Sequence, residues 1–441
     1  MQKMSNISEM KWDVVIIGAG IAGLTASVYL ARAGRKVLLL ERAEEPGGRA
    51  ASKNIADAWI NLGPHALYKS ACGILQEVGV TPTGATPKPN SLLVYKKTKG
   101  GDVALPLFQF LLGSFLKWSE KTQLIRFYAQ MQKEDTSILQ NINLQKYLET
   151  RLPSPRVRNA VLALVRTSTY CSAPDLLSAG AAIAQLQNGQ VLYVDGGWRT
   201  LVDALKEQAL AAGVTIQCGC SARTIAGSEP EMIVSLKDGT ILKTHYVLST
   251  LGPKESLALL DPALQPEEAA MFERLVPIRA ACLDLVMAEM PKPKTTFAMG
   301  ADYPWYFSNH SAIAKFSDNP KQMVVHVMKY LRPGADSNAK QDEQELEQFL
   351  DLIQPGWRLH VIQRRFLPHL LVSHAVVAAA SGGYSGRPGP VVKGRKGLFV
   401  AGDWVGAEGM LLGASLASAK SAAQCILKDK DHNKVGDSLG A

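Results

Sequence analysis

The sequence predicts an α/β fold with a Rossmann-like domain, in which a parallel sheet and a β-meander are interrupted by an inserted α+β domain. Two observations support this. An apolar strand at residues 14–17 runs directly into a glycine-rich turn and then into a helical pattern rich in Ala and Leu. A second strand-to-helix pattern with clustered glycines stands at residues 397–415. We therefore expect one sheet that is assembled from separated parts of the chain.

The first turn has the sequence GAGIAG and begins at Gly18. Gly18 permits the tight turn, Gly20 lets the backbone approach a diphosphate, and Gly23 lets helix and strand pack closely. Ala22 lies in the same first helical turn, where free N–H groups and the positive end of the helix dipole favour anions. The turn therefore predicts a dinucleotide site.

A second strand, at residues 36–40, ends in Glu41. A carboxylate at this spacing is typical of a contact with a ribose 2′-hydroxyl, and the neighbouring Arg42 is a further candidate contact. Both NAD and FAD fit these residues.

Residues 45–49 read EPGGR. This segment resembles an extension found in the FAD-containing superfamily of amine oxidases, protoporphyrinogen oxidases and bacterial phytoene desaturases. The resemblance implies a glutathione-reductase-like FAD fold in which Gly48 and Arg49 run along FAD, with Arg49 near its diphosphate. The alternative is a plain turn between strand and helix.

The segment GLFVAGDW at 397–404, followed by GMLLGAS at 409–415, is similar to the C-terminal FAD segment of the same superfamily. By this resemblance Asp403, after Gly402, accepts a hydrogen bond from the ribityl chain of FAD. Gly409 opens a helix whose N-terminus faces the flavin, and Met410 and Leu411 lie beside the pyrimidine end of the ring. Trp404 is a candidate wall on the far side of the ring.

Weaker matches agree with this assignment. Gly63, Pro64 and His65 resemble the family's turn beside the flavin, and residues 195–205 resemble its helix entry. Ala222 stands where family members usually have valine at the contact with adenine.

The chain of 441 residues is long enough for two domains. We expect an FAD-binding domain of three segments and a substrate domain of two insertions, the first mostly helical. The expected meander strands are 232–236, 241–243 and 246–249, and the second insertion has strands at 281–287 and 323–328 with a polar helix at about 340–353. The boundaries are 1–69, 190–255 and 386–430 for FAD binding, 70–189 and 256–385 for the substrate domain, and 431–441 for a flexible tail.

Composition excludes several classes of function. The net charge of +9 comes from scattered basic residues that are not interleaved with aromatics, which argues against nucleic-acid binding. The six cysteines include no C-x-x-C pair, which favours reduced thiols in the cytoplasm and predicts no metal site. No signal peptide or stretch of roughly 20 apolar residues is visible, so we expect at most peripheral contact with a membrane.

The stretch 105–118 is apolar nearly all round, as expected of a short apolar helix. Three interpretations remain open. It packs in the core, it forms a wall or lid of a lipophilic tunnel, or it contacts a membrane surface.

The chemistry expected here is hydride transfer from a substrate carbon to flavin N5, which needs no catalytic triad. His65 is the candidate for a base or an orienting group, and His369 and His374 lead toward the C-terminal FAD segment. No cysteine is placed for covalent attachment, so we expect noncovalent FAD. No second glycine fingerprint is present for NADPH, so we expect dioxygen or a quinone-like acceptor.

The first hypothesis for function is an FAD-dependent dehydrogenase or desaturase of a lipophilic or polyene-like substrate. The alternatives are an amine oxidase that forms hydrogen peroxide, with Tyr306, Tyr384 and Trp404 as candidate aromatic walls, and a redox-neutral isomerase that uses reduced FAD.

Overall fold

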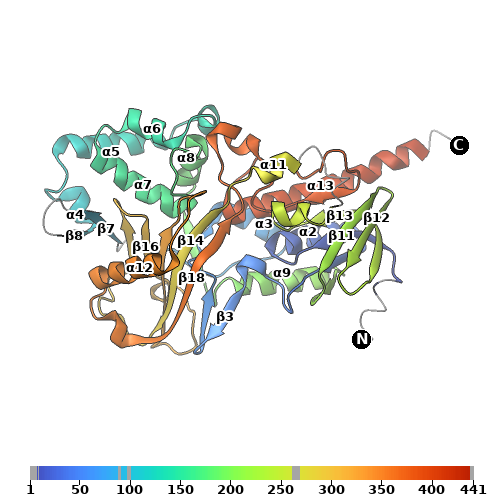
Figure 1. Ribbon diagram of the computed structural model, residues 1–441, viewed down its shortest axis with the longest axis horizontal. Coiled ribbons are helices and arrows are strands. Elements are labelled where there is room, and N and C mark those ends of the chain that lie inside the picture. The colour runs from blue at the N-terminus through green and yellow to red at the C-terminus, as the bar shows by residue number, and fades with distance from the viewer. Residues whose placement is uncertain (1–6, 8, 88–90, 97–100, 261–268, 438–441) are drawn as a thin grey trace.

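The computed structural model describes the chain except residues 1–6, 8, 88–90, 97–100, 261–268 and 438–441. Figure 1 shows two lobes side by side, and the long strands β14 (Ile278–Met287) and β18 (Val361–Ser373) run along the junction between them. Each lobe is built around one seven-stranded sheet.

The first sheet joins segments from the beginning, the middle and the end of the chain. Its strands are β1 (Trp12–Ile17), β2 (Val37–Leu40), β10 (Thr215–Gln217), β11 (Ala222–Ser228), β12 (Glu231–Leu236), β13 (Ile241–Ser249) and β19 (Leu398–Val400). The order is β10-β2-β1-β13-β12-β11, and β19 pairs with β13. The strands β10, β2, β1, β13 and β19 are parallel, whereas β11, β12 and β13 form the antiparallel meander.

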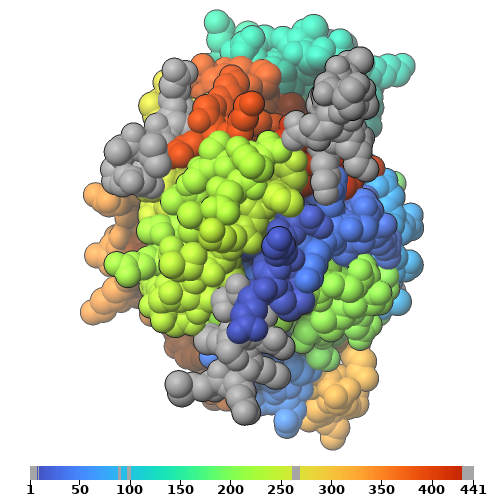
Figure 2. Space-filling view, turned by 90° about the vertical axis from the view of Figure 1, so that its right-hand side faces the viewer, coloured from blue at the N-terminus to red at the C-terminus, as the bar shows by residue number. Residues whose placement is uncertain are grey.

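Alternate residues of β1 serve the two faces of this sheet, as expected for a strand with a period of two. Val14 and Ile16 pack under the helices α2 (Ile21–Arg32), α9 (Arg199–Ala211) and α13 (Leu411–Asp437). Val15 and Ile17 pack against the meander on the other face. Figure 2, which views the molecule from the right-hand side of Figure 1, shows the meander (yellow-green) beside the N-terminal segment (blue). The predicted Rossmann-like fold is confirmed.

Two details of the prediction differ from the structure. The predicted meander strands 241–243 and 246–249 are one strand, β13, because its first half pairs with β12 and its second half with β1 and β19. Helix α13 continues to Asp437 and so enters the segment predicted as a tail, whose last four residues lie outside the described part of the chain.

The second sheet contains strands from both inserted segments. Its strands are β7 (Ser91–Lys96), β8 (Asp102–Pro106), β14, β15 (Phe297–Gly300), β16 (Trp305–Asn309), β17 (Met323–Tyr330) and β18. The order is β18-β14-β17-β16-β15-β7-β8, and the parallel pair β7–β15 connects the two insertions. Helix α12 (Ala339–Ile353) packs Leu346 and Phe349 against one face of the sheet.

The other face lies under a helical layer from the first insertion. This layer consists of α4 (Leu107–Leu112), α5 (Trp118–Met131), α6 (Leu144–Arg151), α7 (Pro155–Thr169) and α8 (Ala179–Gln187). The remaining elements are α3 (Cys72–Glu77), α10 (Pro253–Leu257), α11 (Ala269–Glu273) and the short strands β3 (Ser52–Ile55), β4 (Ala58–Asn61), β5 (Leu67–Tyr68), β6 (Gly84–Ala85) and β9 (Val191–Val194).

The expected continuous apolar helix at 105–118 is wrong. Strand β8 ends at Pro106, α4 lasts only six residues, and α5 begins at Trp118. Pro106 cannot donate a backbone hydrogen bond, and Gly113 ends α4 in an extended conformation where a Cβ would lie 2.4 Å from the Gln109 carbonyl oxygen. Across the described residues, no helix is long and apolar enough to cross a membrane.

Candidate cofactor and active site

The glycine turn between β1 and α2 has the close packing that its sequence predicts. Gly18 adopts a φ of +102°, which favours glycine, and its N–H donates to the Leu40 carbonyl at 2.8 Å. A Cβ at Gly23 would lie 2.0 Å from the Gly18 carbonyl oxygen, so a side chain there collides with the backbone. At Gly20 a Cβ would meet only the Gly47 carbonyl oxygen, at 3.9 Å. The backbone at Gly20 is therefore open to a ligand.

The EPGGR segment lies alongside this turn. The Gly47 N–H donates to the Ala19 carbonyl at 2.9 Å, and Gly20 and Gly47 form an isolated β-bridge. A Cβ at Gly48 would lie 3.6 Å from Gly20 Cα. The two glycine-rich segments thus meet without side chains. The space beside their backbone fits the diphosphate of a dinucleotide such as FAD.

Glu41 lies at the end of β2 and is buried beside the glycine turn. One carboxylate oxygen accepts the Ala19 N–H at 2.8 Å, and the other accepts the Ala43 N–H at 3.0 Å. Each oxygen retains a lone pair that could accept a hydrogen bond from a ribose hydroxyl. Arg42 is exposed and makes none of these contacts, and Ala22 is buried in α2.

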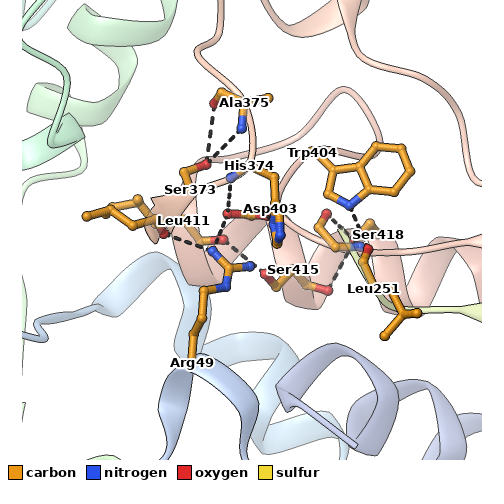
Figure 3. Close-up of polar contacts among 12 residues, drawn as sticks. Arg49, Leu251, Ser373, His374, Ala375, Asp403, Trp404, Leu411, Ser415 and Ser418 are labelled. Carbon is orange, nitrogen blue, oxygen red and sulfur yellow. Dashed lines mark hydrogen bonds and ion pairs between the residues drawn. The ribbon is translucent and has the colours of Figure 1, made fainter. Parts of the chain in front are cut away.

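Asp403 is the centre of a buried cluster of charges at the other side of the site (Figure 3). Its carboxylate accepts hydrogen bonds from Arg49 Nη1 at 2.7 Å and from His374 Nδ1 at 2.9 Å. Burial alone would raise the pKa of this carboxyl, but Arg49 and His374 outweigh burial and hold the pKa well below its usual range. Asp403 is therefore an anion with fixed orientation, suited to accept a hydroxyl hydrogen bond.

Helix α13 begins immediately beyond this cluster. Gly402 is fixed by Ser418, whose hydroxyl accepts the Gly402 N–H at 2.9 Å. Gly409 has a φ of +63° and Leu411 a φ of +54°, an uncommon conformation for a leucine. The N–H groups in the first turn of a helix have no acceptor within the helix, so this end can stabilise negative charge on a bound ring.

The turn Gly63–His65 faces the lobe that is built around the second sheet. A Cβ at Gly63, which has a φ of +79°, would lie 2.5 Å from the Leu370 side chain and 3.6 Å from Cys282 Sγ. The Pro64 carbonyl accepts the Tyr170 hydroxyl at 2.9 Å. The turn is thus held close to β14 and β18, with no room for a side chain at Gly63.

His65 is held in one protonation state. Burial lowers the pKa of its imidazole to about 4, so the ring is neutral near pH 7. Nδ1 lies 2.9 Å from the Gly63 carbonyl oxygen, which can only accept, so Nδ1 carries the proton and Nε2 has a lone pair. The ring packs against Trp198 with centroids 4.4 Å apart. A neutral imidazole in this state can accept a proton or a hydrogen bond.

Behind this turn lies a charged network that the sequence did not predict. Asp284 is fully buried, with Arg365 Nη2 at 2.6 Å and His326 Nδ1 at 2.6 Å. Arg365 also donates to the Asn61 carbonyl, and Cys282 Sγ donates to Asp284 at 3.1 Å. Burial would raise the pKa of Asp284, but His326 and Arg365 outweigh burial and lower it. The signal for this network in the sequence is Asp284 within the apolar run 280–287.

Cys282, Asp284 and His326 could in principle offer ligands to a metal ion, since their ligand atoms lie within 4.8 Å of one another. The Arg365 guanidinium occupies the same carboxylate and opposes a second cation there. The cluster is therefore better described as a buried ion pair that connects β14, β17 and β18 to the end of β4.

The structure does not bring all the sequence candidates to the site. His374 contacts Asp403, but His369 is exposed. Trp404, considered as a wall of the ring, is buried in the core against Phe272 and donates to the Leu251 carbonyl at 3.0 Å. Ala222, at the start of β11, lies two residues after Cys220, whose N–H donates to the Glu41 carbonyl at 2.8 Å, so the segment that carries Ala222 lies beside the end of β2.

Residues 21–427 match the family described as flavin containing amine oxidoreductase. The chain belongs to this family. Membership agrees with the predicted superfamily and with FAD as the cofactor, and it places the protein in a class of flavoprotein oxidoreductases.

Individual relatives match over limited lengths. A limonene dehydrogenase polypeptide of Castellaniella defragrans is 51% identical over 63 residues, which are 14% of this chain and 11% of that protein. Hydroxyneurosporene desaturase of Rubrivivax gelatinosus is 25% identical over 254 residues, and the match covers 48% of each chain. The chain thus spans about half or less of the length of these curated relatives.

Likeness in structure extends over nearly the whole chain. An oxidoreductase from Methanosarcina mazei has a TM-score of 0.73 at 20% identity, with 94% of this chain and 100% of that chain covered. At this identity the likeness shows the fold alone.

Proposed function

We propose that the protein is an FAD-dependent oxidoreductase that dehydrogenates, or desaturates, a lipophilic or polyene-like substrate. The observation that carries this proposal is one continuous apolar cluster in the substrate lobe. It extends from Met410, beside the start of α13, through Tyr170 and Tyr306 to Phe110 and Met299. The last two line a cavity of about 390 Å³ between α4, α5 and α7. An apolar cavity of this kind suits a hydrocarbon chain better than a charged substrate.

The chain's own residues hold the cofactor in this proposal. The backbone at Gly20 and Gly48 receives the diphosphate, Glu41 a ribose hydroxyl, and Asp403 a ribityl hydroxyl. FAD, when bound, supplies the two-electron acceptor for a hydride from a substrate carbon. Cys425 lies within α13, more than three turns beyond its start, so we propose that FAD is held without a covalent bond.

His65 is proposed as the polar group at the reacting carbons. Its Nε2 lone pair accepts the proton that a substrate loses from the carbon next to the one that loses hydride. Tyr170, through its bond to the Pro64 carbonyl, holds the turn that carries His65. Because burial keeps the ring neutral at pH 7, the Nε2 lone pair is free at that pH.

We propose dioxygen or a quinone-like compound as the electron acceptor. Any contact with a membrane is proposed to be peripheral. The absence of a second glycine fingerprint from the sequence supports an acceptor other than a nicotinamide.

The test is anaerobic bleaching of the flavin absorbance by candidate substrates. We expect a polyene or its saturated precursor to bleach the wild type, and His65→Ala to slow bleaching at least 100-fold, the usual contribution of a general base. His369→Ala, at an exposed histidine, is the matched control and retains the wild-type rate. Bleaching by amines alone, with hydrogen peroxide on reaeration, would replace the proposal with an amine oxidase.

The amine oxidase is the second candidate, supported by aromatic side chains within the apolar cluster. Tyr306 packs edge-on against Tyr330 at 6.4 Å and Phe297 at 5.2 Å. Trp404, in contrast, lies in the core of the other lobe and supplies no wall. Product formed only by pre-reduced protein, without net oxidation, would indicate an isomerase instead.

A further inference from the structure

Large apolar side chains are exposed mainly at one end of the molecule. Of the fifteen exposed large hydrophobic residues in the described part of the chain, eight lie between Phe108 and Ile142. Leu112 and Trp118 are the most open of them, at 80% and 78% exposed. Figure 1 shows α4 and α5 at the end of the molecule opposite the C-terminus. Isolated exposed leucines are normal on a protein surface. A concentration of exposed apolar side chains in one segment, in contrast, is typical of an interaction surface.

Six of these side chains form a single surface, which we call the α4–α5 face. Along α5, Trp118, Ile125 and Tyr128 are separated by seven and three residues, spacings that place side chains on one side of a helix. Lys121 ties the two helices together, because its Nζ donates to the Leu112 carbonyl at 3.2 Å. The members of the α4–α5 face are Phe108, Leu111, Leu112, Trp118, Ile125 and Tyr128.

The apolar cavity opens at this face. Leu111, Ile125 and Tyr128 are exposed and at the same time line the cavity, so they form its mouth. Its deeper walls, among them Val161 and Met299, are buried and belong to the apolar cluster that reaches α13. The cavity favours a lipid partner, because a lipid surface can supply a hydrocarbon chain to an apolar cavity. A protein partner that only covered the face would not need the cavity.

The charges around the face are mainly positive. Between residues 117 and 135 the basic side chains are Lys117, Lys121, Arg126 and Lys133, and the acidic ones are Glu120, Glu134 and Asp135. Glu134 pairs with Arg151 at 2.9 Å, and Asp135 accepts the Ser137 N–H at 3.0 Å. Glu120 is engaged, since it accepts the Ser154 hydroxyl at 2.6 Å and pairs with Arg156 at 3.7 Å. Apolar and aromatic side chains bordered by lysine and arginine suit an anionic lipid surface.

The geometry points to the α4–α5 face as a docking surface for an anionic lipid bilayer, with the cavity as the entrance for a hydrocarbon chain. The docking goes beyond the reaction, whereas the role of the cavity rests on the proposed lipophilic substrate. On docking, the exposed indole and leucines enter the interface, and the lysines and Arg126 meet lipid headgroups.

The docking is tested by sedimentation of the FAD-loaded full chain with vesicles. We expect binding to an equimolar mixture of phosphatidylserine and phosphatidylcholine, and much weaker binding to phosphatidylcholine alone. The variant with both Leu112→Ser and Trp118→Ser should lose most binding. Lys117→Gln and Arg126→Gln should each weaken it about fivefold. Leu359→Ser changes a leucine that is 89% exposed outside this face, and it should bind like the wild type.

Several results would overturn the docking. Equal binding by Leu359→Ser and by the Leu112/Trp118 double variant would do so, as would no vesicle binding by the wild type. A dimer that dissociates in the double variant, without vesicle binding, would make the face a contact between two copies. In each case bleaching of the flavin by a detergent-dispersed polyene still decides the proposed function separately.

The cavity is tested with a long-chain polyene fatty acid whose fluorescence rises in apolar sites. Ala160→Phe and Leu164→Phe each add bulk to the cavity wall. We expect at least one to retain FAD and vesicle binding while losing most of the fluorescence increase. Wild-type fluorescence in both filled variants would show that the probe does not enter this cavity.

Discussion

Arg49 and Asp403 form an ion pair of 2.7 Å across 354 positions of sequence, and the carboxylate is almost completely buried. Arg49 also donates to the Val372 carbonyl at 2.8 Å, so one side chain connects the EPGGR segment, the end of β18 and the C-terminal FAD segment. The pair brings the two separated halves of the proposed cofactor site together.

Asp403→Ala should weaken FAD binding without abolishing it. One charge-assisted hydrogen bond is worth about 1.5–3 kcal/mol, which corresponds to about 10- to 150-fold in the dissociation constant. Fluorescence titration of apoprotein with FAD measures the change. Asp318→Ala, at a side chain that is 94% exposed, is the control and should leave affinity unchanged. An unchanged affinity in Asp403→Ala would remove this carboxylate from the site.

Gly20→Val should give folded but colourless protein. Gly20 has an extended backbone (φ −73°, ψ −179°) that valine tolerates, so the effect comes from a side chain in the space beside Gly47. Circular dichroism should remain that of the wild type while bound FAD is lost. Gly73→Ala, where a Cβ meets nothing within 4 Å, is the control and should remain yellow. Yellow, stoichiometric Gly20→Val would contradict the diphosphate assignment.

His65 should make stability depend on pH below neutrality. Its pKa is about 4 in the folded protein and 6.5 when unperturbed, so the unfolded state binds more protons between these values. This contribution, at most about 3 kcal/mol, is present above pH 6.5 and is lost as pH falls toward 4. Urea unfolding from pH 7 to pH 4 should show a smaller loss for His65→Gln than for the wild type. Parallel curves for the two proteins would show that His65 is not held neutral.

Asp284→Asn should destabilise the fold strongly. Removal of the carboxylate charge leaves Arg365 largely buried without its anion, and breaking a buried pair from one side costs about 3–5 kcal/mol. Denaturant unfolding measures this free energy. The exposed Asp318→Asn, which weakens a surface pair with Lys315, should change it by less than about 1 kcal/mol. A small effect at Asp284 would mean that the network does not hold β14, β17 and β18 to β4.

Local patterns predicted the elements whose contacts lie close in sequence. The strand, the glycine turn and the helix at 12–32 follow from residues that are close together in sequence. The same is true of the position of Glu41 directly after β2. The stretch 105–118 differs from the predicted helix because apolar composition alone does not show where a helix begins or ends. Only its proline and glycine, set against neighbouring strands, divide it into β8, α4 and the start of α5.

The sequence by itself determined the order of the Rossmann-like elements, because glycine turns and strand periodicity are local properties of the backbone. The resemblance of two of its segments to a known superfamily indicated the family and the cofactor. The tertiary structure alone decided which side chains meet. Asp284 reaches His326 and Arg365 through the register of β14 with β17 and β18, and Trp404 turns into the core rather than toward the site. The tertiary structure also decided that α4 and α5 expose their apolar side chains, because burial depends on the packing of distant elements and not on composition.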